Sequence, residues 1–335
     1  MIDCCSRLGF INALAASAYG ATTVAQAPLP ARAPSTVPAP PGGGRTRVVL
    51  LGTAGGPALR PGRSSPAAAV VVDGVPYVVD CGYGVGRQLV DARISPAAVR
   101  AIFVTHHHSD HNADVGNLLV LGWATGAKSR VDVFGPLETS PGSPAITTSV
   151  GKLVDLALQY HGYDVAVRIP DEGRVDPRPL FVPHDVAGAG AVYRDERIVV
   201  EAAVVHHPPV APALAYKFRT PDRTIVFSGD TTYSEALIAF ARGADVLIHE
   251  VLLTSAIDRL LALVPNASRL REHIVAAHTD AADVGRVAAA AGVKRVVLTH
   301  FVPSYDPTLH DLDWTAPVGA HFGGEIVVGR DLLDV

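Results

Sequence analysis

The chain contains the stretch Ala101-Ile-Phe-Val-Thr-His-His-His-Ser-Asp-His111. Its β-branched first half predicts a buried strand that runs directly into a cluster of polar side chains: His106, His108, Asp110 and His111. Imidazole nitrogen and carboxylate oxygen are ligands that zinc accepts readily, and a catalytic zinc keeps one position open for water. In a tight turn the first two of these residues can face one metal ion and the last two a second. His107 is then left over and is expected to face away.

Three further predicted strands end in residues of the same kind. Residues 202–205 run into His206-His207, residues 225–229 into Asp230, and residues 296–299 into His300. Strand ends of one sheet share a rim, where catalytic groups commonly lie. Together with the first motif they supply enough ligands for two metal ions. The remaining isolated histidines are expected to be surface or core residues: His161, His184, His310 and His321.

The overall composition is that of a packed globular protein, with 48% hydrophobic and 18% charged residues. The formal net charge is −4, and the 28 Lys and Arg residues form no basic cluster. The chain therefore has no electrostatic footprint for a nucleic-acid backbone, which makes nucleic acid an unfavoured substrate. Among the cysteines, only Cys81 falls in the predicted folded body, so no internal disulfide is expected.

The N-terminal region divides into two segments before the folded domain. Residues 1–27 resemble a secretory signal peptide, with an apolar run over 8–25 and the sequence Ala25-Gln-Ala27 as cleavage site. The thin basic region and Pro28 weigh against this, and a mis-assigned start codon is the alternative. A cleaved signal implies a periplasmic or secreted protein, and otherwise a cytoplasmic one; the run is too short and too rich in Ala, Ser and Thr for a stable membrane anchor. Residues 28–44 are a linker rich in Pro, Ala and Gly, followed by the folded domain at 45–335.

The folded region alternates short β-branched runs with loops and helical stretches. Strands are expected at 48–51, 68–72, 77–79, 101–104, 199–205, 224–227, 246–248 and 296–298. Helices are expected at 234–242, capped by Ser234, at 281–291, capped by Thr279 or Asp280, and over the run 150–161. This order predicts an α/β domain in which helices flank a sheet.

The motifs, in their order, resemble those of the metallo-β-lactamase superfamily over residues 45–331. The matching pieces are Leu51-Gly-Thr-Ala-Gly-Gly-Pro57, Val79-Asp-Cys-Gly82, Thr105 through His111, His207 with Pro208-Pro209, Ser228-Gly-Asp-Thr231 and Leu298-Thr-His-Phe301. The resemblance implies an αββα sandwich with a dinuclear metal site along one edge. Zinc is the expected metal, with Mn²⁺ or Fe²⁺ as alternatives.

The same resemblance implies how the ligands are shared. It assigns His106, His108 and His207 to the first metal, Asp110, His111 and His300 to the second, and Asp230 to a position between them. His206 competes with His207 for the third position. We favour His207 because the family's ligand directly precedes the Pro-Pro pair where that pair is present.

Two further motifs point to a branch of the superfamily that contains tRNA 3′-processing endonucleases, cyclic-nucleotide phosphodiesterases and zinc-dependent arylsulfatases. They are Asp245-Val-Leu-Ile-His-Glu250 and Ala277-His-Thr-Asp280. The resemblance implies that Glu250 orients His278 beside the leaving group. The carboxylate raises the basicity of the imidazole, whereas a following helix start opposes its protonation. A simple helix-entry residue is the alternative for His278.

The expected function is dinuclear metal-dependent hydrolysis by a metal-bridging hydroxide, which Asp110 helps to steer. A small-molecule ester is the expected substrate, an aryl sulfate or a phosphodiester, with opening of a lactone or amide ring as the alternative. A tRNA endonuclease is less favoured, because only 23 positions separate His207 from Asp230, too few for a substrate-binding arm. An iron-dependent oxidoreductase is less favoured too, since no flavin-binding domain is visible. Trp123 either lines the pocket or packs under the metal loop, and a homodimer is compatible with the sequence.

Overall fold

The computed structural model describes residues 46–139, 147–264 and 267–335. The predicted signal peptide (1–27) and linker (28–44) lie outside these residues. Two sheets form the centre of the domain, and their order is β1-β2-β3-β4-β5-β8 in one and β15-β14-β13-β12-β11-β10-β9 in the other. A short ribbon of β6 and β7 stands apart from both.

The first sheet mixes antiparallel pairs at β1-β2-β3 with parallel pairs from β3 to β8. Its strands, with the ribbon, are β1 (Thr46–Gly52), β2 (Ala67–Val72), β3 (Val75–Val79), β4 (Ala101–Phe103), β5 (Val131–Pro136), β6 (Glu138–Thr139), β7 (Thr147–Thr148) and β8 (Phe181–Val186). The helical segments that follow these strands are α1 (Val85–Asp91), η1 (Pro96–Ala98), α2 (Ser109–Asn112), α3 (Val115–Ala124), α4 (Val150–Tyr160) and α5 (Gly162–Glu172).

The second sheet is antiparallel from β9 to β12 and parallel from β12 to β15. Its strands are β9 (Gly190–Arg194), β10 (Val199–His207), β11 (Val210–Arg219), β12 (Thr224–Phe227), β13 (Val246–Leu252), β14 (Arg295–Val302) and β15 (Glu325–Val328). The helical segments of this half are α6 (Glu235–Ala241), η2 (Thr254–Ala256), α7 (Ile257–Leu261), α8 (Leu270–Ala277), α9 (Ala281–Ala291) and α10 (Asp311–Gly319).

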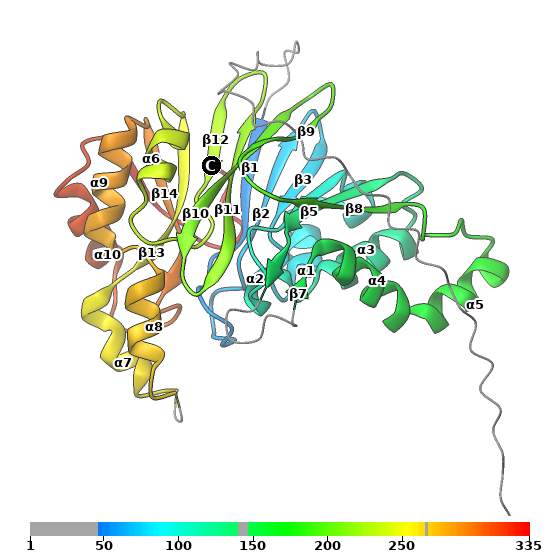
Figure 1. The fold of residues 1–335 in the computed structure, drawn as a ribbon, viewed down its shortest axis with the longest axis horizontal. Helices are drawn as coiled ribbons and strands as arrows, with labels where there is room; N and C mark the ends of the chain where they lie inside the picture. The colour runs from blue at the N-terminus through cyan, green and yellow to red at the C-terminus, as the bar shows by residue number, and fades with distance from the viewer. Residues whose placement is uncertain (1–45, 140–146, 265–266) are drawn as a thin grey trace, which may run out of the picture. The chain divides into compact units, whose positions relative to one another are not determined.

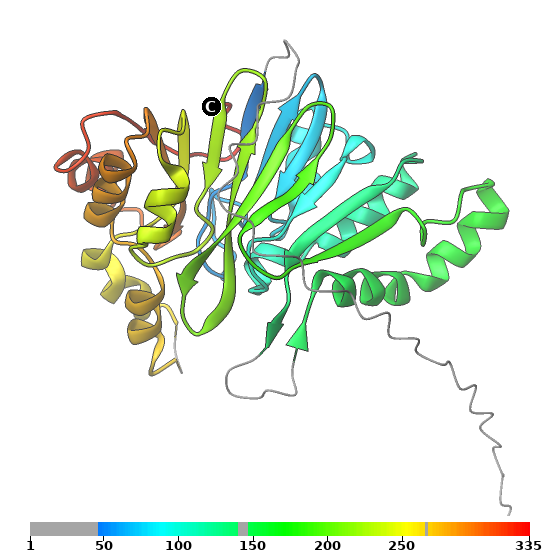
Figure 2. The ribbon, with the colours of Figure 1, turned by 45° about the horizontal axis from the view of Figure 1, so that its top comes forward.

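The domain has four layers, with helices on the outer face of each sheet (Figures 1 and 2). Apolar cores fill the three spaces between these layers. Side chains such as Phe103, Tyr216 and Phe218 fill the space between the two sheets. A second core joins the first sheet to α1, α3 and α4, and a third joins the other sheet to α6, α9 and α10. A sheet must bury each apolar face against another element, and this stacking does so on all four faces. The predicted αββα sandwich is therefore confirmed.

The predicted strands are all present, and the two capped helices occur where their end signals place them. The Ser234 hydroxyl accepts a hydrogen bond from the Leu237 N–H at the start of α6, and Asp280 caps α9 through the Ala282 N–H. Gly292 ends α9 with φ 63°, a left-handed conformation that favours glycine. The sequence did not indicate α1, α3, α5, α7, α8 or α10, and the short helix α2 lies where a tight turn was expected. Among the helices of the described residues, none is long and apolar enough to cross a membrane.

Candidate metal centre

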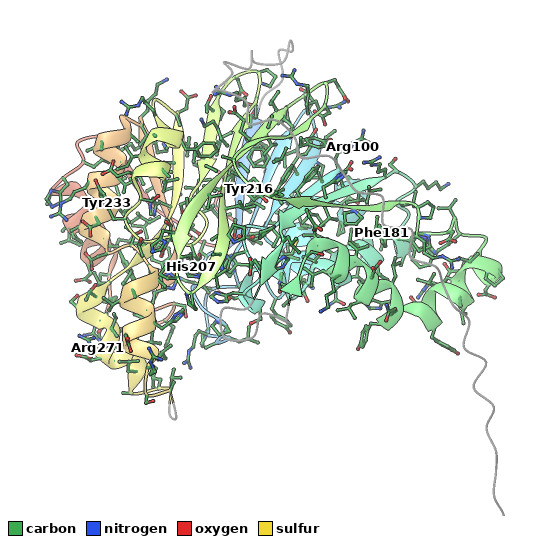
Figure 3. All side chains as sticks on the ribbon, in the orientation of Figure 1. Arg100, Phe181, His207, Tyr216, Tyr233 and Arg271 are labelled. Carbon is green, nitrogen blue, oxygen red and sulfur yellow. The ribbon has the colours of Figure 1, made fainter. Side chains whose placement is uncertain are left out.

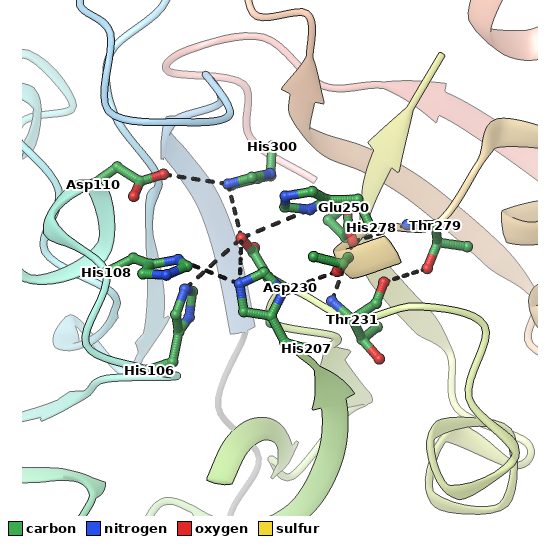
Figure 4. Close-up of polar contacts among 12 residues, drawn as sticks. His106, His108, Asp110, His207, Asp230, Thr231, Glu250, His278, Thr279 and His300 are labelled. Carbon is green, nitrogen blue, oxygen red and sulfur yellow. Dashed lines mark hydrogen bonds and ion pairs between the residues drawn. The ribbon is translucent and has the colours of Figure 1, made fainter. Parts of the chain in front are cut away.

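The predicted metal ligands converge at one edge of the two sheets, although they come from four separate parts of the chain (Figure 4). The first motif follows β4, with His108 as N-cap of the short helix α2. His207 is the last residue of β10 (Figure 3), Asp230 follows β12, and His300 lies within β14. Side chains that are distant in sequence therefore meet because the carboxyl ends of these strands share a rim.

The first group consists of His106, His108 and His207, whose ligand atoms lie within 4.8 Å of one another. The Nε2 atom of His207 is 3.3 Å from Nδ1 of His108. On its other side, the Nδ1–H of His207 donates to the Ala277 carbonyl at 2.8 Å, which leaves Nε2 unprotonated for a metal. His206, in contrast, is exposed and belongs to none of the candidate ligand groups of the described residues. The structure thus brings His207, not His206, into the cluster.

The second group consists of Asp110, His111 and His300. The Nε2 atoms of both histidines lie 3.4 to 3.5 Å from Oδ2 of Asp110. Asp230 lies between the two groups, because its Oδ2 is 3.9 Å from Nε2 of His106 and 3.2 Å from Nε2 of His300. This is the position that the sequence analysis expected for a carboxylate shared by two metals.

Several ring nitrogens of the cluster have no hydrogen-bond partner among the described residues, so a metal ion would satisfy them. Within the described part of the chain, Nε2 of His106, Nε2 of His111 and both ring nitrogens of His300 are buried without a hydrogen-bond partner. Buried polar atoms of this kind are rare in folded proteins and call for a partner such as an ion. Several imidazoles and two carboxylates, all aimed at the same small space, are a donor set that suits zinc.

Electrostatics in the cluster favour the ligand forms of the first group. Burial and the neighbouring imidazole of His111 hold the pKa of His106 well below its usual value. Burial and the proximity of His207 lower the pKa of His108 to about 4. Burial alone raises the pKa of Asp230, but the imidazoles of His300 and His111 outweigh it and keep this pKa well below its usual range. The first group is thus a set of neutral imidazoles beside a carboxylate that stays ionised.

His111 behaves differently from the first group. Burial lowers its pKa, but the carboxylates of Asp230, Asp80 and Asp110 outweigh burial and raise the pKa well above its usual value. Without a metal ion, the positive charge of protonated His111 therefore balances the negative charge of these carboxylates. A metal ion at this position would displace that proton.

Asp80 supports the second group, a role that the sequence analysis did not assign, although the residue lies in one of the matched motifs. Its Oδ2 accepts from Nδ1–H of His111 at 2.8 Å and from the Thr105 hydroxyl at 3.0 Å. Its Oδ1 accepts from the Thr105 backbone N–H at 2.8 Å. Thr105 Oγ1 in turn lies 3.1 Å from Nδ1 of His106. Asp80 therefore orients one ligand of each group, directly or through Thr105.

Glu250 and His278 lie beside the cluster, as the sequence analysis expected. The Nδ1 atom of His278 is 3.2 Å from Oε2 of Glu250 and 3.9 Å from Oδ2 of Asp230. Glu250 is itself held by the backbone N–H groups of Thr231 and Thr279 at Oε1. Burial lowers the pKa of His278, but the charge and hydrogen bond of Glu250, with Asp230, raise it to about 9.

The helix that precedes His278 also favours its protonated form. His278 is the C-cap of α8, and its backbone N–H donates to the Ile274 carbonyl. The negative end of a helix stabilises an imidazolium, and this opposes the effect of the start of α9 just beyond. The sequence analysis could not compare the effects of the two helix ends, because α8 was not predicted.

Trp123 does not line the pocket. It is 1% exposed within α3, and its indole N–H donates to the Val175 carbonyl at 2.8 Å. Of its two proposed positions, the packed one is correct, so Trp123 offers no aromatic wall for an aryl group.

His107 faces away from the cluster as expected, with Nε2 at 2.8 Å from the Pro136 carbonyl. His184 pairs with Asp132 at 2.6 Å, away from the cluster.

The four-layer fold and this donor set define a metal-binding protein of the metallo-β-lactamase type. A family model described as "Beta-lactamase superfamily domain" matches residues 76–301. The chain therefore belongs to the metallo-β-lactamase superfamily and is a metallo-hydrolase of that superfamily.

Similar proteins include ribonucleases. The chain is 32% identical over 287 residues to Ribonuclease Z of Mycobacterium sp. (strain KMS), covering 85% of this chain and 94% of that protein. It is 29% identical to Ribonuclease Z of Mycobacterium bovis (strain BCG / Pasteur 1173P2), with coverages of 85% and 96%. Among solved structures, the fold resembles that of human tRNase Z, short form, with a TM-score of 0.60, 19% identity, and coverages of 86% and 98%.

Proposed function

We propose that this protein is a two-metal phosphodiester hydrolase. The observation that carries the proposal is the Glu250–His278 pair at the edge of the metal centre. Nδ1 of His278 lies 3.9 Å from Oδ2 of Asp230. A protonated imidazole at this distance can donate its proton to the leaving oxygen of an ester. The ribonuclease names of the relatives support a phosphoric diester as the ester.

The residues of the two groups would hold two divalent metal ions, for which zinc is our proposed identity. Such ions supply a Lewis acid for a phosphoryl oxygen and a water that ionises near neutral pH. Asp230 would keep the two metal positions at a fixed spacing, and Asp110 would hold the second position. Glu250 orients the His278 ring and keeps it protonated, because its charge raises the pKa to about 9.

We favour a small phosphodiester over a long RNA. Only Pro208 and Pro209 separate β10 from β11, and the turn from β11 to β12 closes with the Thr220 N–H donating to the Arg223 carbonyl. No substrate-binding arm is therefore inserted between His207 and Asp230. The net charge of −4 also offers little attraction for a polyanion.

RNA cleavage is the second candidate, and the relatives favour it. Their ribonuclease names apply to proteins that this chain covers over 94 to 96% of their length, which weighs against the expectation from composition that nucleic acid is unfavoured. An aryl sulfate has no comparable support, because Trp123 is buried and the relatives quoted above are nucleases. Lactone or amide opening keeps only the general support of the fold.

The test is turnover by purified full-length protein loaded with zinc or manganese. The substrates are bis(p-nitrophenyl) phosphate, p-nitrophenyl sulfate, a lactone, a cephalosporin and a tRNA precursor with a 3′ extension. We expect diester turnover that Asp110→Ala and Asp230→Ala abolish. Asp132→Asn is the matched control, because Asp132 on β5 pairs with His184 on β8, away from the metal centre.

The outcomes separate the candidates. Turnover that survives both Asp110→Ala and Asp230→Ala would refute a two-metal mechanism. Sulfate hydrolysis without diester hydrolysis would refute the phosphodiester assignment, and efficient trimming of the tRNA precursor would shift the function to RNA processing.

A further inference from the structure

His273 lies beside the metal centre and has no assigned role. It belongs to α8, five residues before His278, and its side chain is partly exposed. Its ring centroid is 6.2 Å from that of His108, 6.4 Å from that of His207 and 6.4 Å from that of His278. The His273 ring is thus almost equally distant from the rings of His108, His207 and His278.

The position of His273 is fixed by the contacts of its helix with the site. The Ala277 carbonyl at the end of α8 accepts the hydrogen bond from Nδ1–H of His207 at 2.8 Å. His278, the C-cap of the same helix, is held by Glu250. Two contacts therefore anchor the C-terminal end of α8 to the metal centre, and His273 is carried on the turn just before them.

His273 has unused hydrogen-bonding capacity on this side of the cluster. Within residues 46–139, 147–264 and 267–335, no side-chain hydrogen bond or ion pair involves its ring, and it belongs to none of the candidate ligand groups. A neutral imidazole offers one N–H donor and one acceptor. The basic residues next to it are engaged elsewhere, since Arg269 pairs with Glu272 and Arg271 with Asp258.

The spacing to the neighbouring rings suits a bridging ligand. Two N–H···O hydrogen bonds of about 2.9 Å through one oxygen join nitrogen atoms up to about 6 Å apart. The rings of His273 and His278, with centroids 6.4 Å apart, do not bond to each other but leave room for such an oxygen. An oxygen of a phosphoryl group at the cluster meets this requirement.

We propose that His273 is a substrate-binding residue that donates a hydrogen bond to a phosphoryl oxygen on the solvent side of the metal centre. This inference rests on the proposed phosphodiesterase function and extends its site to a residue outside the metal ligands and the Glu250–His278 pair. His273 binds the phosphoryl group without holding metal and without transferring a proton.

The test compares His273→Ala and His273→Gln with the wild type in zinc-loaded, full-length protein. We expect His273→Ala to lower kcat/KM for bis(p-nitrophenyl) phosphate about 10- to 100-fold, as for the loss of one hydrogen bond to a charged group. The loss should fall mainly on KM, because the contact is already made in the bound substrate. Glutamine retains a donor and should recover most of the loss. His161→Ala, which removes a partly exposed histidine between α4 and α5, is the control.

Two independent measurements keep this inference separate from the proposed function. Zinc content must be the same in His273→Ala and wild type, and a lost ion would overturn the assignment by making His273 a ligand. Calorimetric titration with inorganic phosphate should show binding at least about tenfold weaker in His273→Ala. If the wild type hydrolyses no diester, the proposed function fails, but the phosphate affinities still decide this inference. Equal affinities in the two proteins, or no phosphate binding to the wild type, would overturn it.

Discussion

Replacing Asp80 by Asn should weaken the second metal position without unfolding the protein. Asp80 has φ 57°, a conformation that Asn and Asp tolerate better than most residues, so Asn fits the backbone. The amide oxygen of Asn can still accept from the Thr105 N–H, as Oδ1 of Asp80 does in the wild type at 2.8 Å. The NH₂ group, however, replaces the oxygen that accepts from both the Thr105 hydroxyl and His111.

The loss acts through the tautomer of His111. In the wild type, Nδ1 carries the proton and donates to Asp80 at 2.8 Å, which leaves Nε2 free for metal. An amide NH₂ at this place donates, so Nδ1 becomes the acceptor and the proton moves to Nε2. Loss of such a supporting partner typically weakens metal binding about 10- to 100-fold, or about 1.4 to 2.7 kcal/mol.

The assay is a competitive zinc titration with a chromophoric chelator, fitted to two sites and combined with the zinc content by mass spectrometry. We expect the weaker of two sites to lose affinity in Asp80→Asn, and Asp132→Asn to behave as wild type. If both zinc affinities in Asp80→Asn stayed within about threefold of the wild-type values, the argument that Asp80 sets the His111 tautomer would be wrong.

Three further predictions concern other parts of the site. His207→Ala should lower the zinc content below two ions per chain, whereas His206→Ala should retain it; elemental analysis decides, and the reverse pattern would exchange the two assignments. Glu250→Gln should move the basic limb of the pH profile of kcat to lower pH by about one unit or more, because Glu250 raises the pKa of His278 to about 9 and His278 donates only while protonated. An unmoved limb would remove His278 from the proton transfer. Trp123→Ala should lower the free energy of unfolding by about 3 to 5 kcal/mol, as for a buried aromatic residue, and Trp123→Phe should leave KM unchanged. A KM that rose in Trp123→Phe at unchanged stability would return this residue to the pocket wall.

Local patterns in the sequence were sufficient where the structure depends on neighbouring residues. The spacing of His106, His108, Asp110 and His111 places two pairs of ligands on one turn, whatever packs around it. Ser234, Asp280 and Gly292 mark the ends of α6 and α9 because capping involves residues within a few positions. Alternation and β-branching indicated the strands for the same reason. α8 was missed because much of its surface is polar or exposed, so its sequence has little apolar periodicity.

Tertiary structure decided the features that depend on distant partners. The choice of His207 over His206 depends on which face of β10 points inward, and the pairing of β10 with β11 shifts register between Val205 and His207. Adjacent strand residues face opposite sides, so alternation by itself does not say which of the two histidines faces inward. The Pro-Pro pair that follows was the sequence signal that favoured His207. Tertiary contacts likewise place Asp80, which meets His111 across 31 positions, and His273, which reaches the site only because α8 is anchored to it. The sequence by itself indicated a set of metal-ligating residue types at one rim, whereas the packing of the strands and of α8 determined which side chains surround that rim.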